Sequence, residues 1–172
     1  PNAAKAMRLE GRTIIVTGGA SGLGGATIDM VVGAGGSAVI VDVNEQTGSA
    51  AAARHGDKVA FVRTDVTSDG EVQHAVDVAV ERYGGVHGLV CAAGIAVAER
   101  VLPRKGVQPL AHFTRTIDVN LVGTFNAVRL AAAAMATNSP NDAGERGVIV
   151  TTASVAAFDG QIGQAAYAAS KG

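Results

Sequence analysis

The chain has 172 residues, of which 48% are hydrophobic and 17% charged, with 23 glycines and only 3% aromatic residues. This balance excludes an intrinsically disordered chain, and the single cysteine, Cys91, excludes an intrachain disulfide framework. The formal net charge of −1 leaves no basic excess, so we expect no nucleic-acid partner.

Because few residues precede the first apolar run, we expect no signal or transit peptide. No apolar run reaches the ~18 residues that a membrane-spanning helix needs, and the nearest, at 130–136, is short. We therefore expect a cytoplasmic protein without a membrane partner. No break in composition divides the chain, so we expect residues 1–172 to form a single domain.

Short apolar runs alternate with helical segments along the whole chain. The apolar runs predict strands at 13–17, 38–41, 59–63, 88–91 and 147–151. Apolar residues at helical spacing predict helices at 23–32, at 45–54, from Ser68 onward and at 112–136. This alternation predicts parallel βαβ units, and the continuously apolar runs predict strands buried under helices on both faces of the sheet.

The helix that follows the third predicted strand has a start signal in its sequence. Ser68 with Glu71 three residues later matches a capping box. The apolar residues that share one face of this helix are Val72, Ala75, Val76, Ala79 and Val80.

A glycine-rich turn, residues 17–24, follows the first predicted strand and opens the first predicted helix. Glycine lets the backbone approach a pyrophosphate closely, and the helix N-terminus favours an anion. The absence of a following Lys-Ser or Lys-Thr argues against an NTPase P-loop. A tight turn without a ligand is the alternative, because the spacing differs from Gly-x-Gly-x-x-Gly. The residues that we expect to bind a cofactor here are Gly18, Ser21, Gly22, Leu23 and Gly24.

Asp42 closes the second predicted strand, where a doubly wound sheet meets the adenosine ribose of a dinucleotide. A carboxylate at this position accepts hydrogen bonds from both ribose hydroxyls and repels a 2′-phosphate. We therefore expect the cofactor to be NAD rather than NADP. The alternative is a solvated aspartate or a helix cap near Asn44.

Tyr167 and Lys171 lie one helical turn apart, on one face of a predicted helix. An ammonium group beside a phenol favours the ionised phenolate, which is a stronger base than the neutral hydroxyl. The alternative is a surface tyrosine beside a solvated lysine.

Together these motifs resemble those of the short-chain dehydrogenase/reductase family. In chain order, the matching positions are the turn 17–24, Asp42, Asp65, Val66, Ala93, Gly94, Asn120, Ser154, Tyr167 and Lys171. The resemblance implies a Rossmann-type α/β fold, a doubly wound parallel sheet with strand order 3-2-1-4-5. It also implies an NAD-dependent oxidoreductase that interconverts a secondary alcohol and a ketone.

The same resemblance implies roles for individual residues. Tyr167 is expected to be the general acid/base, and Lys171 to assist it and hold the nicotinamide ribose. Ser154 is expected to form a hydrogen bond with the substrate oxygen, on which negative charge develops during hydride transfer. Asn120 is expected to hold a water that links Lys171 to solvent, with a packing role as its alternative. The expected cofactor contacts outside the glycine turn are Asp42, Asp65, Val66, Ala93 and Gly94.

Three segments, 94–98, 138–147 and 152–167, resemble a narrower group, the type-2 3-hydroxyacyl-CoA dehydrogenases, also called 17β-hydroxysteroid dehydrogenases type 10. This resemblance implies 3-hydroxyacyl-CoA and 3-oxoacyl-CoA as substrates, with hydroxysteroids or other short-chain alcohols as the alternative. It places Gln161 and Gln164 near the substrate, while the resemblance to the short-chain dehydrogenase/reductase family implies a homotetramer. We expect no metal, because the four histidines lack ligand spacing and read as surface or capping residues.

Two features depart from the family pattern. Cys91 stands where the family usually has asparagine, and we expect it to be an inert buried thiol. The sequence ends at Gly172, one residue after Lys171, whereas family members continue through further strands. We therefore expect the last predicted strand to be an exposed edge and the active site to be incomplete. The alternatives are an NAD-binding fragment without catalysis and a structural chain without a cofactor.

Overall fold

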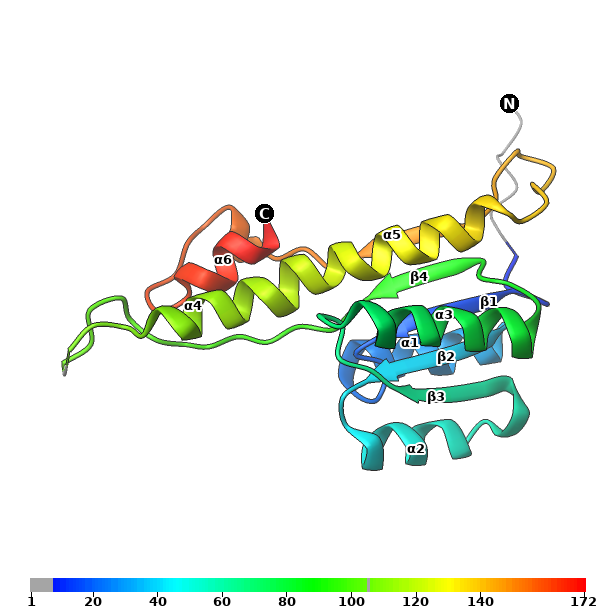
Figure 1. The fold of residues 1–172 in the computed structure, drawn as a ribbon, viewed down its shortest axis with the longest axis horizontal. Helices are drawn as coiled ribbons and strands as arrows, with labels where there is room; N and C mark the ends of the chain where they lie inside the picture. Colours follow the sequence, from blue (N-terminus) through cyan, green and yellow to red (C-terminus); the bar gives the residue numbers. More distant parts are fainter. Residues whose placement is uncertain (1–7, 105) are drawn as a thin grey trace.

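The computed structural model describes residues 8–104 and 106–172. Its five parallel strands form one sheet in the order β3-β2-β1-β4-β5, which confirms the expected topology (Figure 1). In the central strands Thr17 pairs with Val41 on one side and Cys91 on the other, so these strands end at one level. The strands are β1 (Thr13–Thr17), β2 (Ser37–Asp42), β3 (Val59–Arg63), β4 (Gly88–Cys91) and β5 (Val148–Thr151).

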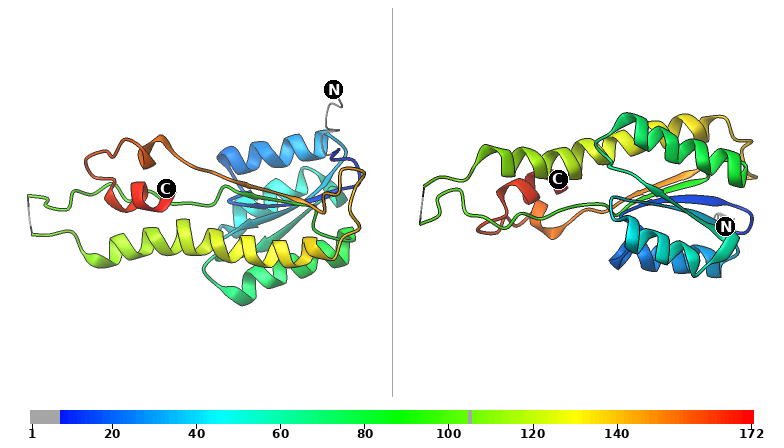
Figure 2. Two further views of the ribbon diagram at one scale, coloured as in Figure 1. Left: turned by 90° about the horizontal axis from the view of Figure 1, so that it is seen from above. Right: turned by 60° about the horizontal axis from the view of Figure 1, so that its bottom comes forward.

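Helices cover the two faces of the sheet (Figure 2). On one face lie α1 (Gly22–Gly33) and α2 (Glu45–Ala53), and on the other lie α3 (Asp69–Tyr83) and α5 (Gly123–Ala136). The remaining helical elements are two short 3₁₀ turns, a fourth α-helix, a π turn and a last short helix: η1 (Gly56–Lys58), η3 (Val155–Ala157), α4 (Leu110–Ile117), η2 (Asp118–Val122) and α6 (Ala165–Lys171).

The alternation of side chains along β1 gives each face of the sheet its own core. Ile14 and Val16 pack with Ile28 and Val31 of α1. Ile15, between them, packs on the opposite face with residues of α3 and α5. Because β1 is buried on both faces, it reads as a continuous apolar run in the sequence.

The segment predicted as one helix over 112–136 is a continuous helical rod with a π turn inside it. It begins at Leu110 and runs through α4, the π turn η2 and α5. Its C-terminal half packs on α3 and β4, while its N-terminal half extends beyond the sheet and carries α6 beside it (Figure 1).

This rod corrects the expectation that no segment is long and apolar enough to cross a membrane. The stretch Leu110–Ala136 contains an 18-residue window with a mean hydropathy of 1.3, which meets that test by length and composition. One third of the window is buried inside the protein. Polar residues that the fold uses, including Asn120 and Asn126, lie on the same rod.

The start of α3 forms only half of the predicted capping box. The Ser68 Oγ atom accepts a hydrogen bond from the Glu71 backbone N–H at 3.4 Å. The Glu71 carboxylate, however, accepts from the Asp65 N–H at 2.7 Å, because the Ser68 N–H already donates to the Asp65 carbonyl. Four of the five apolar residues predicted to share one face are buried, but Val80 is 44% exposed.

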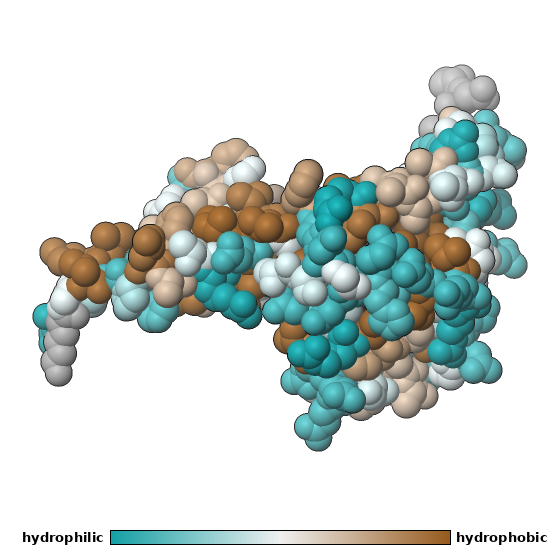
Figure 3. All heavy atoms as spheres, viewed as in Figure 1, coloured by the Kyte–Doolittle hydropathy of each residue, from teal (hydrophilic) through white to brown (hydrophobic). Residues whose placement is uncertain are grey.

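The edge strand β5 is the exception to strand burial. In the part of the chain that the structure describes, it pairs only with β4, and all four of its residues are exposed. The sequence expectation of buried strands is therefore wrong for β5, whereas the expectation of an exposed apolar edge is confirmed. Further hydrophobic residues are exposed on the projecting arm, which consists of the loop between β4 and α4 and the start of α4 (Figure 3). Among them are Val101, Leu102, Val107 and Leu110.

Leu89 of β4 tests how much of the stability comes from the core on the α3 side. It is 1% exposed, so Leu89→Ala leaves a cavity, and we expect the free energy of unfolding to fall by about 2–5 kcal/mol. Leu102→Ala, at a 73% exposed site, is the matched control, with an expected change within about 0.5 kcal/mol. Urea titrations followed by circular dichroism measure both. Equal losses for the two variants would contradict this account of the core.

Cys91 is 3% exposed, and burial raises the pKa of its thiol to about 11, opposed in part by the charge of Lys171. The folded state therefore holds this proton more tightly than the unfolded chain. The resulting stability is complete below the ordinary thiol pKa of 9.0 and is lost as the pH rises toward 11.

We expect the folded chain to react slowly with iodoacetamide at mildly alkaline pH, because only the thiolate reacts and burial blocks access. The shift in pKa alone lowers the ionised fraction by about a hundredfold. Mass spectrometry of the alkylated chain measures the rate, with urea-unfolded protein and glutathione as references. A rate for the folded chain that matches glutathione would show that Cys91 is not an inert thiol.

Candidate cofactor and active site

A cavity of about 430 Å³ opens where the carboxyl ends of β1, β2, β3 and β4 meet. This is the position at which open α/β sheets bind ligands. Every residue predicted to contact the cofactor lines this cavity, although their role in binding stays a prediction. These residues are Gly18, Ser21, Gly22, Leu23, Gly24, Asp42, Asp65, Val66, Ala93 and Gly94.

The glycine turn fits its place because Gly18 and Gly24 have no side chains. A Cβ atom at Gly18 would lie 2.7 Å from the Ala93 backbone nitrogen, and one at Gly24 would lie 2.2 Å from the Gly18 carbonyl oxygen. At Gly22, by contrast, a Cβ atom would meet nothing within 4 Å, since this residue faces open space. Gly18 and Gly24 thus serve backbone packing, whereas Gly22 has a positive φ of 54° that other residues rarely adopt.

The N-terminus of α1 points its backbone N–H groups toward the same space. The N-cap residue is Ser21, and its side chain makes no capping hydrogen bond. The N–H groups of the first helical turn therefore remain available to an anion in the cavity.

Asp42 is half-buried and joins the glycine turn to the loop after β2. One carboxylate oxygen accepts a hydrogen bond from the Ala20 N–H at 3.2 Å, and the other accepts from the Asn44 N–H at 3.0 Å. The cap of α2 is Asn44, whose side chain accepts from the Thr47 N–H, so Asp42 is not the helix cap. Each carboxylate oxygen keeps further acceptor capacity toward the cavity.

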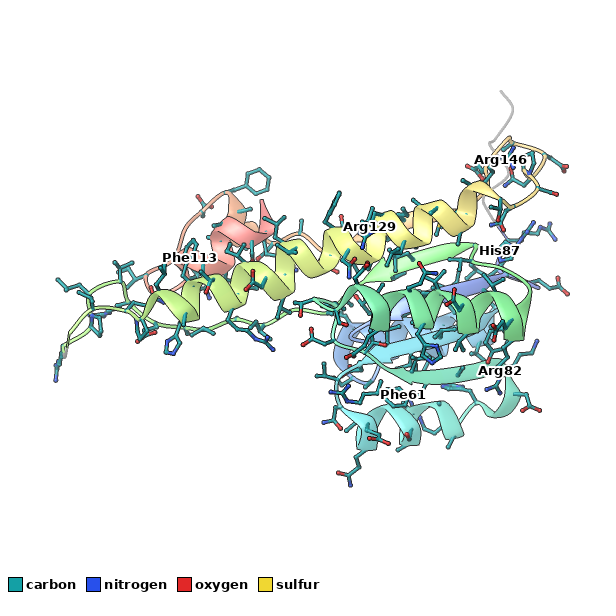
Figure 4. The ribbon with its side chains drawn as sticks, viewed as in Figure 1. Phe61, Arg82, His87, Phe113, Arg129 and Arg146 are labelled. Atoms are coloured by element: carbon teal, nitrogen blue, oxygen red, sulfur yellow. The ribbon has the colours of Figure 1, made fainter. Side chains whose placement is uncertain are left out.

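Asp65 and Val66 form the wall beyond β3. The Asp65 carboxylate accepts hydrogen bonds from the Thr67 backbone N–H and hydroxyl, at 2.9 and 2.7 Å, and these bonds lower the pKa of Asp65. The Val66 carbonyl accepts from the Asn126 side chain at 3.0 Å. Arg129, labelled in Figure 4, in turn donates to Asn126 and to Asp69, so α5 fixes this wall.

Asn120 lies in the π turn and is 3% exposed. Its side chain accepts from the Ile95 N–H at 2.8 Å and donates to the Ile95 carbonyl and the Ser170 Oγ atom, each at 2.9 Å. It therefore ties the rod to the loop after β4 and to α6. A Cβ atom at Gly94 would lie 3.3 Å from Asn120 Oδ1 and 3.8 Å from Lys171 Nζ, which places both residues at the border of the cavity.

Lys171 and Tyr167 share one side of α6. The Lys171 Nζ atom donates to the Thr152 carbonyl at 2.8 Å and lies 5.9 Å from the centroid of the Tyr167 ring. Ser154 is half-buried, and its Oγ atom accepts from the Ala156 N–H at 3.2 Å at the start of η3. These residues do not line the cavity, and in the described part of the chain no hydrogen bond joins Ser154 to Tyr167.

The predicted substrate residues lie in the turn before α6. Gln161 is exposed and Gln164 is half-buried, and the Gln164 N–H donates to the Gln161 carbonyl at 3.0 Å. Neither residue lines the cavity. Their contact with a substrate stays a prediction.

The structure also adds residues that sequence reasoning missed. Arg115 and Val119 line the cavity from the rod, and Ile95 lines it from the loop after β4. The four-residue spacing of Arg115 and Val119, just before Asn120, is the signal that places them on one helix face.

The histidines agree only partly with the prediction of surface or capping residues. His74 is exposed, whereas His87, labelled in Figure 4, is half-buried, and its Nδ1 atom accepts from the Thr13 N–H at 3.2 Å. Burial lowers the pKa of His87, and the charge of Arg12 adds to that effect. Within residues 8–104 and 106–172, no group of three or more potential metal ligands comes together.

The sequence is similar to dehydrogenases along nearly its whole length. The family described as short chain dehydrogenase matches residues 12–172. The chain is 48% identical over 172 residues to the 3-hydroxyacyl-CoA dehydrogenase type-2 of Bos taurus and to that of Homo sapiens. These matches cover 99% of this chain and 66% of each relative. The chain thus spans just under two thirds of the relatives' length.

Solved structures give the same result. The 3-hydroxyacyl-CoA dehydrogenase type-2 from Mycobacterium avium superposes with a TM-score of 0.90 at 42% identity, covering 96% of this chain and 66% of that one. A short-chain dehydrogenase/reductase from Brucella melitensis, titled glucose/ribitol dehydrogenase, superposes with a TM-score of 0.83 at 32% identity, covering 96% and 65%. Because the family match runs from the first strand to the last helix, this chain belongs to the short-chain dehydrogenase family.

Proposed function

We propose that this chain is part of an NAD-dependent oxidoreductase that interconverts a secondary alcohol and a ketone, with 3-hydroxyacyl-CoA and 3-oxoacyl-CoA as the substrate pair. The observation that carries the proposal is the cavity at the sheet edge, with the glycine turn, Asp42 and Asp65 on its walls and Lys171 at its border. The likeness to 3-hydroxyacyl-CoA dehydrogenases type-2 supports the choice of substrate.

The residues around the cavity fit a nicotinamide dinucleotide. A volume of about 430 Å³ lies in the range of small-molecule and cofactor sites. The space beside Gly22 can accommodate a pyrophosphate, and the N–H groups of the first turn of α1, which follows Ser21, can donate hydrogen bonds to it. The Asp42 carboxylate can accept hydrogen bonds from unphosphorylated ribose hydroxyls. When bound, the nicotinamide accepts or supplies the hydride, and the chain supplies position and electrostatics.

Tyr167 is the proton-transfer residue in this proposal. Its hydroxyl gives a proton to the carbonyl oxygen during reduction and takes it back during oxidation. Ser154 donates a hydrogen bond to the same oxygen, on which negative charge develops. Lys171 donates a hydrogen bond to the Thr152 carbonyl, which holds its ammonium group near the Tyr167 ring.

Asn120 is a positioning residue in the same scheme. Its side chain is hydrogen-bonded to the Ile95 N–H and to the hydroxyl of Ser170. Because Ser170 directly precedes Lys171, these bonds help to fix the position of Lys171. We propose that the widened π turn also lets Asn120 hold a water that links Lys171 to solvent, as in the implied family mechanism.

A second candidate is a dinucleotide-binding chain without turnover. Gln161 and Gln164 lie outside the cavity, and the chain spans 66% of the length of its relatives. This candidate binds NADH but lacks the walls that hold a substrate. Hydroxysteroids or other short-chain alcohols are alternative substrates. We further propose one domain over residues 1–172, assembly as a homotetramer and a cytoplasmic location.

Tyr167→Phe tests the proton-transfer step. We expect kcat for NADH-dependent reduction of acetoacetyl-CoA to fall by about 10²- to 10⁴-fold, because the variant cannot supply the proton. NADH binding, measured by fluorescence titration, stays unchanged. Tyr83→Phe is the matched control, because Tyr83 lies on α3 outside the cavity and its buried hydroxyl has no hydrogen-bond partner among the residues that the structure describes.

Full turnover by Tyr167→Phe would refute the role of Tyr167. If the unaltered chain binds NADH but does not reduce acetoacetyl-CoA, the second candidate is the correct one.

Asp42→Ala tests cofactor choice. Removing the carboxylate removes both the ribose contacts and the repulsion of a 2′-phosphate, so we expect the ratio of the NADPH to the NADH dissociation constant to fall by about tenfold or more. Calorimetric titration with each cofactor measures the ratio. Asp142→Ala, in the exposed loop before β5, is the control and keeps the original preference. An unchanged ratio in Asp42→Ala would remove Asp42 from the ribose site.

A further inference from the structure

Arg115 is the one lysine, arginine or histidine that lines the cavity in the described part of the chain. It belongs to α4 and is exposed. The described ion pairs do not include it, so its guanidinium group is not committed to another side chain there. A solvated arginine on a helix surface is the simplest interpretation, but that interpretation does not account for the position of Arg115 on the cavity wall.

The position of Arg115 is defined by its neighbours. It lies one helical turn before Val119, so both side chains share the face of the rod that lines the cavity. Asp65 and Val66 line the same cavity from the loop after β3. Val66 and Val119 belong to one hydrophobic cluster, and the charge of Arg115 helps to lower the pKa of Asp65. Arg115 therefore lies at the β3 end of the cavity.

This combination suits a flat aromatic ring with polar edges. Val66 and Val119 offer apolar contact to its faces, and the Asp65 carboxylate can accept a hydrogen bond from an exocyclic amino group. A planar guanidinium group stacks on an aromatic face through both dispersion and cation–π attraction. A phosphate fits less well, because the neighbouring carboxylate offsets the charge of Arg115.

We propose that Arg115 packs its guanidinium group against the adenine ring of the bound dinucleotide and closes the adenosine end of the cavity. This inference rests on the proposed function, since it needs a dinucleotide in the cavity. Arg115 is then a cofactor-positioning residue, which adds to binding of the base and leaves the nicotinamide end untouched.

Arg115→Ala and Arg115→Lys test the contact. The matched control is Arg100→Ala, because Arg100 is exposed on the projecting arm and does not line the cavity. Calorimetry measures the dissociation constants of NADH and adenosine, and competition measures that of reduced nicotinamide mononucleotide, which lacks the adenosine. We expect Arg115→Ala to weaken NADH and adenosine binding by about tenfold and to leave the mononucleotide unaffected. Arg115→Lys recovers only part of the loss, because an ammonium group cannot stack, and Arg100→Ala matches the unaltered chain.

Four results would overturn this inference alone, given an unaltered chain that binds NADH. They are NADH binding by Arg115→Ala within twofold of the original, an equal loss for the mononucleotide, full recovery in Arg115→Lys, and adenosine binding that does not change. If the unaltered chain does not bind NADH, the proposed function fails, and this inference falls with it.

Discussion

The close contact between the glycine turn and the end of β4 is the constraint on which the site depends. Gly18 lies so near the Ala93 backbone that a side chain has no room, and its N–H donates to the Val41 carbonyl at 2.8 Å. The Thr17 hydroxyl accepts from the Ala93 N–H at 3.2 Å. One backbone bond and one side-chain bond thus join the ends of three parallel strands. The cavity has its shape because that junction brings the first turn of α1, Asp42 and Gly94 to one edge.

The long rod supplies the other half of the site and fixes it at several points. Its α5 half packs on α3 and β4, and through Asn126 it holds the wall that contains Val66. Its π turn places Asn120 where one amide group bonds both the loop after β4 and α6. Because Lys171 follows Ser170 directly, the position of the lysine depends on this amide. A buried amide that makes three hydrogen bonds to two segments is well suited to such a joint.

Local patterns in the sequence predicted most of the fold, because buried parallel strands and amphipathic helices leave strong signals. The strand order and the residues around the cavity came from motifs in register with those elements, and all ten cofactor positions meet in one cavity. The π turn could not be predicted, since the apolar spacing of the segment is that of an ordinary α-helix and nothing in residues 118–122 marks an extra residue. Other features could not be predicted because they depend on contacts that form only in the folded chain. They are the hydrogen bond of Glu71 to the Asp65 N–H, the partial burial of His87 and the position of Arg115 on the cavity wall.

The π turn also makes the rod sensitive to length. A π turn holds one residue more than the α-helical path needs, and each residue of an α-helix turns the chain by about 100°. The faces of α4 and α5 are therefore set by that extra residue. A relative that lost one residue between Asp118 and Val122 would form an unbroken α-helix. With α5 anchored on the sheet, its α4 half would be rotated, and the side chains at 115 and 119 would face away from the cavity. The spacing across this turn is thus as much a part of the site as the residues themselves.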